Sequence, residues 1–455
     1  MTMGRGVLNG KVPYKDLFEQ KGPILYFVFA IFELFKNPYI AVFIFELICF
    51  SIYLYYSFKI ARNYLSYYMS IALIMVLGYC TLTWLPFISG GGAVEEYSLP
   101  IIAYFIYIQK QNIDGVEFSK IRSCVLGVLV SILFWTKFTT IIIPAVILVI
   151  WLVQNLLRKN FKDTFISIGF MAIGFLIVTI PIFIWYFAKG AIVDLFYVYF
   201  YCNLFLYSKQ PSTIDNLLSA ISGNVFLIIA FITACIVLIL LLILFFKKSR
   251  NWFLLFLPAI VQLIVFLNIQ NVYLYYFLII MPYFTFLIYF VLKAFDKISI
   301  KTIEKFAVCI IFFATTFGLM FSCSNNICEL GRTKDDYIQF EVAEDIKELA
   351  GTNNYTLFCY AMKDYGFYNV CGVVPKEKFY AKFNFPVESF PEMYEAFDNA
   401  IINKNNDFVI MLKQDYTDKQ EFVCKYYSYV KEYSYIFYDH NLDFMNLEIV
   451  LLKVK

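Results

Sequence analysis

The sequence predicts an all-α polytopic membrane protein with a small α/β domain at its C-terminal end. Of its 455 residues, 61% are hydrophobic and 16% are charged, and the mean hydropathy is +0.70. A soluble protein of this length could not bury so much apolar surface. Apolar runs of about 20 residues recur, and a helix of that length crosses the hydrocarbon core of a bilayer. The C-terminal part is charged and rich in turn residues, which is typical of a folded domain outside the membrane.

Composition and motifs also exclude several classes of protein. The net charge of +3 is too small to favour nucleic acid as a partner. The 11 Cys residues form no CxxC pair, which indicates neither a zinc site nor a disulfide framework, and His440 is the single His. The sequence contains no GxxxxGK[ST] motif and no GxGxxG motif after a strand. These absences disfavour an ATP-driven pump and an enzyme that binds nucleotide sugars in a cytoplasmic Rossmann domain.

The apolar runs predict ten membrane spans within a region that extends from residue 39 to residue 322. A shorter apolar stretch, residues 23–35, is interrupted by Glu33 and Lys36 and is predicted to lie as a helix on the membrane surface. Pro23 suits the first turn of such a helix. The ten spans are residues 39–58, 67–88, 93–109, 120–135, 138–157, 164–188, 224–246, 252–268, 272–292 and 303–321.

The charges of the connecting loops predict the orientation of these spans. Basic residues concentrate in alternate connections, and such connections face the cytoplasm. The other connections hold only Lys137, Lys189 and Lys209. The N-terminal loop (residues 1–38) and the domain from residue 323 to 455 are then extracytoplasmic. The cytoplasmic set comprises Lys59, Arg62, Lys110, Lys120, Arg122, Arg158, Lys159, Lys162, Lys247, Lys248, Arg250, Lys293, Lys297, Lys301 and Lys305.

This orientation places residues 1–36 outside although no signal peptide or earlier span carries them across. We therefore expect the intact protein to have a further span before Met1. In the C-terminal domain, helices are predicted at residues 341–350, 392–403 and 418–430, and strands at residues 355–360, 408–412 and 447–454.

Four short segments, in order and all on the predicted outer face, resemble membrane glycosyltransferases of the GT-C superfamily. Residues 12–18 (VPYKDLF), followed by KGP at 21–23, resemble the first outer loop of the protein O-mannosyltransferase and aminoarabinose-transferase group (glycosyltransferase family 39). Residues 91–100 (GGAVEEYSLP) resemble its second outer loop. Residues 134–139 (FWTKFT) are similar to its Lys-containing junction, and residues 272–282 (VYLYYFLIIMP) to a late span. In that span Tyr275 stands where the family usually has His.

The resemblance implies a GT-C-like helical bundle that transfers a sugar, with inversion, from a polyprenyl-phosphate donor to a glycan, lipid or protein acceptor of the cell envelope. The expected setting is the plasma membrane of a bacterium. In the family the catalytic base is an Asp early in the first outer loop, and no residue of this chain matches it. The resemblance therefore places the expected catalytic Asp upstream of Met1, with Asp16 as a weak substitute.

The chemistry of such a donor selects further candidate residues. Cations stabilise the departing phosphate, and a carboxylate activates the acceptor hydroxyl. Lys137 lies between two apolar runs, where an unpaired Lys is costly, and is the first candidate for the phosphate. Lys21 is the second, ahead of Arg5 and Lys15. Each could also be an ordinary solvated or snorkelling side chain.

The adjacent carboxylates Glu95 and Glu96 could orient the acceptor or bind a divalent metal such as Mg²⁺, Mn²⁺ or Ca²⁺. With no nearby cation in the sequence, they could equally cap the helix that follows, and Glu96 is the slightly better candidate for function. Tyr14, Tyr275 and Tyr276 are candidates to line the cavity, although Tyr14 could simply shape its turn and the other two could belong to the interfacial aromatic belt. Glu46 lies inside a span and is expected to be hydrogen-bonded.

Two other functions remain open from the sequence alone. The chain could be a transporter or flippase for lipid-linked glycans, although it lacks the internal repeat typical of transporters. It could also be an inactive relative that only binds a lipid-linked glycan.

Overall fold

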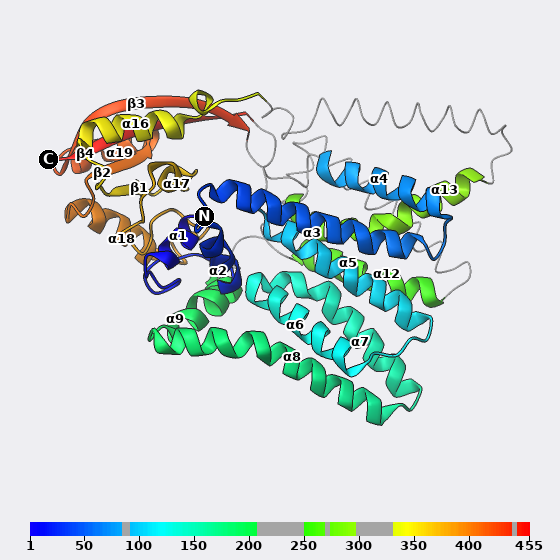
Figure 1. Ribbon diagram of the computed structural model, residues 1–455. Coiled ribbons are helices and arrows are strands. Elements are labelled where there is room, and N and C mark those ends of the chain that lie inside the picture. The colour runs from blue at the N-terminus through cyan, green and yellow to red at the C-terminus, as the bar shows by residue number, and fades with distance from the viewer. Residues whose placement is uncertain (84–91, 207–249, 269–273, 297–330, 439–443) are drawn as a thin grey trace. The chain divides into compact units, whose positions relative to one another are not determined.

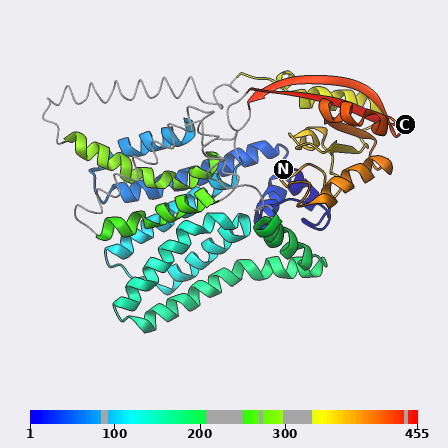
Figure 2. The same cartoon turned by 180° about the vertical axis from the view of Figure 1, so that it is seen from behind.

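The computed structural model describes residues 1–83, 92–206, 250–268, 274–296, 331–438 and 444–455 (Figures 1 and 2). These residues are mostly helical and include one small mixed sheet. The chain divides into two compact units. The helical unit consists of residues 42–180 and 211–330, and the mixed unit consists of residues 1–41, 181–210 and 331–455. The mixed unit thus joins the predicted outer loop, the predicted C-terminal domain and a segment after residue 180.

Each of the eight predicted spans that falls in the described residues coincides with helix. The predicted spans at residues 224–246 and 303–321 lie outside the described residues, as does His440. The helices from the first predicted span onward are α3 (Pro38–Ala61), α4 (Tyr67–Thr83), α5 (Val94–Ile113), α6 (Lys120–Thr136), η2 (Phe138–Ile141), α7 (Ile142–Leu157), α8 (Phe161–Ala188), α12 (Arg250–Asn268), η4 (Leu274–Tyr283) and α13 (Phe284–Asp296).

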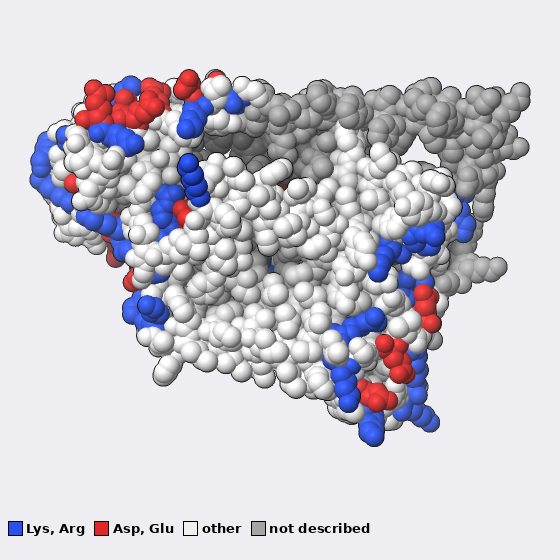
Figure 3. Space-filling model, viewed as in Figure 1, with Lys and Arg blue, Asp and Glu red and all other residues white. Residues whose placement is uncertain are grey.

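Three of the described helical segments are long and apolar enough to cross a membrane: Pro38–Ala61, Phe138–Leu157 and Phe161–Ala188. They indicate a membrane protein, although this number is smaller than the ten spans predicted. α4 and α6 have 17 residues each, and α5 carries two carboxylates in its first turn and a Lys in its last. Charge also divides the surface of the helical unit. On the face shown in Figure 3, Lys and Arg gather with Asp and Glu around the α5–α6 and α7–α8 connections, and the helix surfaces away from these connections are nearly free of charge.

α6 and α8 approach each other closely because two glycines face the opposite backbone. A Cβ added to Gly127 would lie 1.9 Å from the Met171 carbonyl oxygen, and one added to Gly174 would lie 1.9 Å from that of Cys124. Small residues allow this close contact between helices in an apolar environment. Further along the same pair of helices, the Thr179 hydroxyl accepts a hydrogen bond from the Trp135 indole nitrogen at 2.9 Å. This contact fixes the C-terminal end of α6, where Lys137 follows.

The sheet of the mixed unit has the strand order β1-β2-β4-β3. β1 (Leu357–Tyr360) pairs parallel with β2 (Phe408–Leu412), and β4 (Phe444–Val454) pairs antiparallel with both β2 and β3 (Tyr427–Tyr438). β1 and most of β2 are buried without alternation, as expected for strands that are covered on both faces. The helices of this unit are α1 (Thr2–Leu8), α2 (Pro23–Phe32), α9 (Ile192–Leu195), η3 (Phe196–Leu206), η5 (Lys334–Asp336), α16 (Ile338–Ala350), α17 (Phe367–Cys371), α18 (Pro391–Ile402) and α19 (Lys413–Val423).

Several predicted elements of the mixed unit need correction. The helix predicted at residues 418–430 ends at Val423, and the Tyr-rich residues that follow form β3 instead. Tyr and β-branched residues favour strands because they pack well on a pleated surface. α1, α9 and η3 were not predicted. The helix predicted at residues 23–35 is present as α2, which has Pro23 in its first turn and ends at Phe32.

The first loop, residues 9–22, is fixed to the rest of the mixed unit by buried aromatic side chains. The Phe18 ring is fully buried and lies 5.1 to 5.8 Å from four other Phe rings. These distances join the centroids of Phe18 and Phe379, Phe383, Phe385 and Phe390. The Tyr14 ring, also fully buried, stacks on Tyr186 at 5.7 Å and on Tyr199 at 6.4 Å. The loop is therefore part of the core of this unit and not a solvated connection.

We expect the substitution Phe18→Ala to lower the free energy of unfolding of the mixed unit by about 3–5 kcal/mol, because it removes a buried aromatic ring and leaves a cavity. Denaturant-dependent labelling of the buried Cys359 thiol measures this unfolding. Phe187→Ala is the matched control, since Phe187 is 77% exposed, and it should cost about 0.5 kcal/mol or less. Equal effects of the two substitutions would contradict the assigned role of Phe18.

The contact between α16 and β3 predicts a dependence of stability on pH. The Asp345 carboxylate accepts hydrogen bonds from Lys431 Nζ at 2.8 Å and from the Tyr433 hydroxyl at 2.6 Å. Partial burial raises the pKa of Asp345, but these two hydrogen bonds outweigh it and hold that pKa below its ordinary value of 3.8. A carboxyl with a depressed pKa adds stability above its unfolded pKa, and this stability is lost as the pH falls through the folded pKa.

Hydrogen exchange of α16 and β3 in wild type and Asp345→Asn, compared at each pH, tests this dependence. The variant should exchange faster at neutral pH, and the difference should disappear as the pH falls below 3.8. A difference that persisted undiminished at lower pH would show that this pair does not titrate as expected.

Candidate functional site

Lys137 occupies the junction between α6 and η2 in the helical unit. Its amide nitrogen still bonds to the Leu133 carbonyl at 2.9 Å, while its backbone is already extended (φ −160°, ψ 104°). The chain therefore turns at this residue, and the side chain leaves the axis of α6. Because α6 is fixed against α8 by its glycines and by Trp135, the position of the Lys137 ammonium is determined by packing on the preceding helix.

The Lys137 ammonium is held by one carboxylate and one aromatic face. Its Nζ lies 2.5 Å from Glu95 Oε1. The same nitrogen lies 3.6 Å from the centroid of the Tyr276 ring and 5.8 Å from that of Tyr275. A cation over the face of a tyrosine is attracted by the ring quadrupole. Four residues selected from the sequence, from two helices (α5 and η4) and the α6–η2 junction, are thus brought together at one point.

This ion pair is shielded from solvent, since the side chains of Lys137 and Glu95 are 14% and 3% exposed. An ammonium in apolar surroundings is costly unless it is paired. Glu95 neutralises Lys137, and one of the three ammonium N–H groups donates to it. No cation lies near these two carboxylates in the sequence, but folding places Lys137 against Glu95 from 42 positions further along the chain.

Glu96 points to a different partner from that of its neighbour. Successive residues of a helix are about 100° apart around its axis. Glu96 Oε2 accepts a hydrogen bond from the Ala93 backbone nitrogen at 3.3 Å, as a helix cap does. The Glu96 side chain also lies close to the Glu46 carboxyl of α3. Glu46 in turn accepts the backbone N–H of Gly92, whose φ is +78°. The expectation that Glu46 is hydrogen-bonded is confirmed.

The candidates near the N-terminus lie in the mixed unit, and Asp16, Lys15 and Arg5 are occupied by structural contacts. Asp16 accepts the Val12 backbone N–H at 2.7 Å, and neither Lys15 nor Lys21 is its partner. Lys15 Nζ donates to the Lys189 carbonyl at 3.0 Å. Arg5, which was a weaker phosphate candidate, pairs with Glu33 at 3.2 Å.

The backbone carbonyl of Lys21 accepts the hydroxyl groups of Tyr14 at 2.6 Å and of Tyr26 at 2.7 Å. Burial raises the pKa of the Tyr14 hydroxyl well above its ordinary value, so this group stays protonated and donates. Because Tyr14 is fully buried among aromatic rings, it shapes the loop and does not line an open cavity. The Lys21 ammonium itself makes no hydrogen bond or ion pair within the described residues.

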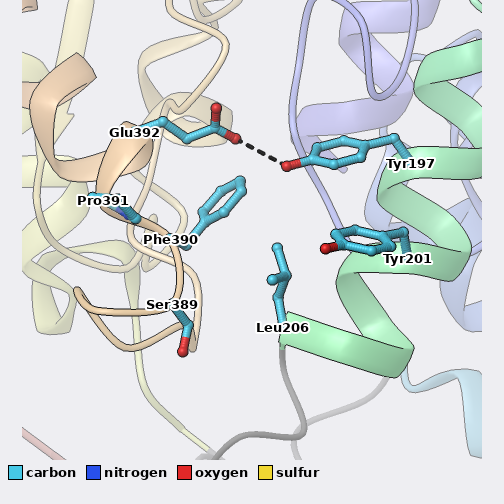
Figure 4. A pocket seen from close by; sticks show the side chains of 7 residues that line it. All are labelled: Tyr197, Tyr201, Leu206, Ser389, Phe390, Pro391 and Glu392. Carbon is cyan, nitrogen blue, oxygen red and sulfur yellow. Dashed lines mark hydrogen bonds between the residues drawn. The ribbon is translucent and has the colours of Figure 1, made fainter.

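A pocket of about 370 Å³ opens on the mixed unit between η3 and the start of α18 (Figure 4). Its lining combines aromatic rings with hydroxyl groups and one carboxylate, and a neighbouring apolar hollow shares Tyr197 and Tyr201 with it. This pocket could not be predicted from the sequence, because its two walls, at residues 197–206 and 389–392, are far apart along the chain. The lining residues are Tyr197, Tyr201, Leu206, Ser389, Phe390, Pro391 and Glu392.

No family model matches the sequence, and no curated protein and no solved structure matches the chain. The site must therefore be judged from its own geometry.

We expect Lys137→Ala to lower the free energy of unfolding of the helical unit by about 3 kcal/mol, because it leaves the buried Glu95 carboxylate without its cation. The double variant Lys137→Gln/Glu95→Gln should recover much of this loss, since two neutral side chains need no mutual neutralisation. Thermal unfolding of Lys137→Gln, Glu95→Gln and the variant that combines them measures the coupling energy. Purely additive effects would show that the ion pair contributes no coupling energy.

Proposed function

We propose that this protein is an integral membrane glycosyltransferase that uses a sugar linked to a polyprenyl phosphate. The observation that carries the proposal is the Lys137 ammonium, which is held by Glu95 and Tyr276 at a helix junction and is shielded from solvent. Two further observations support it. The chain has helices that are long and apolar enough to cross a membrane, and its outer-loop segments resemble those of the GT-C superfamily.

In the proposed reaction an acceptor hydroxyl oxygen forms a bond to the anomeric carbon of the donor sugar. The bond from that carbon to the phosphate oxygen breaks on the opposite side, so the configuration inverts. The hydroxyl proton passes to a base, and the polyprenyl phosphate departs with the bonding electron pair. Positive charge next to the departing oxygen lowers the barrier, because negative charge develops there.

Lys137 is suited to this electrostatic role. Its ammonium has three N–H donors, and Glu95 accepts from one of them. The side chain is 14% exposed, so the ammonium is shielded but not sealed from a bound phosphate. Glu95 holds it in position before the donor arrives, which limits the rearrangement needed in the transition state.

The described residues offer weaker candidates for the catalytic base, for the residue that orients the acceptor and for a metal site. We do not assign Asp16 as the base, because its carboxylate already caps the Val12 amide. Glu96 is the candidate for orienting the acceptor, together with its neighbour Glu46. Within the described residues, no group of three or more His, Cys, Asp or Glu side chains could hold a metal ion. The proposal therefore assigns no step to Mg²⁺, Mn²⁺ or Ca²⁺.

The test uses the full chain in proteoliposomes with radiolabelled undecaprenyl-phosphate mannose, glucose or arabinose and a cell-envelope extract as acceptor. We expect transfer from one of these donors. Lys137→Ala should reduce it by about 100-fold or more, the effect of removing one transition-state donor. Glu96→Gln should reduce it as well, and Lys189→Ala, which removes an exposed Lys of the outer set, should leave it unchanged.

The Lys137→Gln/Glu95→Gln variant separates catalysis from folding, because it lacks the cation without leaving a buried charge. It should remain folded and be inactive. Full activity in both Lys137→Ala and Glu96→Gln would overturn the site. Absence of transfer by the wild type with every donor would overturn the function.

A further inference from the structure

The pocket of the mixed unit is a second place where a small molecule can bind, separate from the residues assigned above. Pockets of about 300–1,000 Å³ that combine aromatic faces with a few polar groups are typical ligand sites. This pocket has a volume of about 370 Å³, and its lining side chains are drawn in Figure 4.

One wall of the pocket consists of two tyrosines of η3. The rings of Tyr197 and Tyr201 are stacked, with centroids 5.5 Å apart and an angle of 17° between their planes. Their side chains are 39% and 46% exposed. Their exposed area therefore offers aromatic surface and two phenol hydroxyls to the pocket.

The opposite wall is the start of α18 and the turn before it. Phe390 is buried and anchored, with its ring 5.4 Å from that of Phe18 and 5.0 Å from that of Phe385. Glu392 and Ser389 add a carboxylate and a hydroxyl. Glu392 Oε1 accepts a hydrogen bond from the Tyr197 hydroxyl at 3.4 Å. No cation pairs with Glu392 within the described part of the chain.

Both walls are held by the first loop, so the pocket is built before any ligand arrives. Phe18 packs on Phe390 of one wall. Asn203 of η3 donates to the Gln20 carbonyl at 2.9 Å, and Tyr199 of η3 stacks on Tyr14. A preformed site loses less conformational entropy when it binds a ligand.

The lining chemistry selects among classes of ligand. The Glu392 carboxylate would repel an anionic ligand. A wholly apolar ligand would leave the polar groups of the pocket without hydrogen-bond partners. The hydroxyl groups of Ser389, Tyr197 and Tyr201 both donate and accept, whereas Glu392 only accepts. A ligand rich in hydroxyls can satisfy all four groups, and the apolar C–H face of a sugar ring can lie on a tyrosine ring.

We propose that this pocket binds a neutral saccharide of one or two rings, which packs on Tyr201 and Tyr197 and donates a hydroxyl to Glu392. The site goes beyond the proposed transferase chemistry, because none of its residues belongs to the Lys137 site.

Saturation-transfer NMR on the full chain in an amphipol tests the proposal, since glycoside detergents would themselves present a sugar. The probes are maltose, cellobiose and N,N′-diacetylchitobiose, with tetramethylammonium as the cationic alternative. We expect at least one disaccharide to bind. Tyr201→Ala and Glu392→Ala should each weaken it about tenfold or more, the loss expected for one charge-assisted hydrogen bond or a comparable contact.

Matched controls keep the test specific. Tyr429→Ala and Glu344→Ala remove an exposed tyrosine and an exposed carboxylate elsewhere in the same unit, and should leave affinity unchanged. Lys137→Ala should also bind normally, so failure of the transferase proposal and failure of this one can be distinguished. The inference is overturned if no disaccharide binds, if the controls weaken binding equally, or if only tetramethylammonium binds.

Discussion

The helical unit depends on one constraint, namely that a polar side chain in apolar surroundings must find a partner. Three polar groups near the α5 and α6 termini satisfy it with a residue distant in sequence. Trp135 donates to Thr179, Lys137 pairs with Glu95, and Gly92 donates to Glu46. Unpaired, each group would cost several kcal/mol in hydrocarbon. The pairings that avoid this cost also fix the ends of the helices. The same interactions therefore determine both the helix packing and the geometry of the candidate site.

In the mixed unit, buried aromatic side chains hold the first loop against the other segments. Residues 12–18 form a short turn whose Tyr14 and Phe18 rings are buried in two separate clusters. One cluster includes Tyr186 and Tyr199, and the other consists of Phe rings from residues 379–390. Burial of rings this large dominates the energy of such a contact. The loop segment that suggested a family resemblance therefore has a clear structural role, whatever its part in chemistry.

Sequence reasoning located elements better than it located partners. Long apolar runs predicted helices because nothing else in a chain has that length and composition. The rotation of a helix is not visible in such a run, so the pattern could not show that Glu95 turns to Lys137 while Glu96 turns to Glu46. β3 was not predicted because the helix predicted at residues 418–430 was continued past Val423 into a Tyr-rich segment. Such a segment prefers a strand. The pocket could not be predicted, because η3 and the start of α18 come together only in the folded chain.

Under the proposed function, the pairing of Lys137 with Glu95 also limits how a phosphate could bind. A lone ammonium would attract an anion strongly but would be costly to keep in an apolar unit before the anion arrives. With Glu95 in place, the resting site is neutral, and an incoming phosphate must share the ammonium with a carboxylate that repels it. Tyr276 eases this competition, because its ring stabilises the cation without adding a formal negative charge. Such a site binds the ground-state donor weakly and gains most when charge on the leaving phosphate rises, which is the condition for catalysis by differential binding.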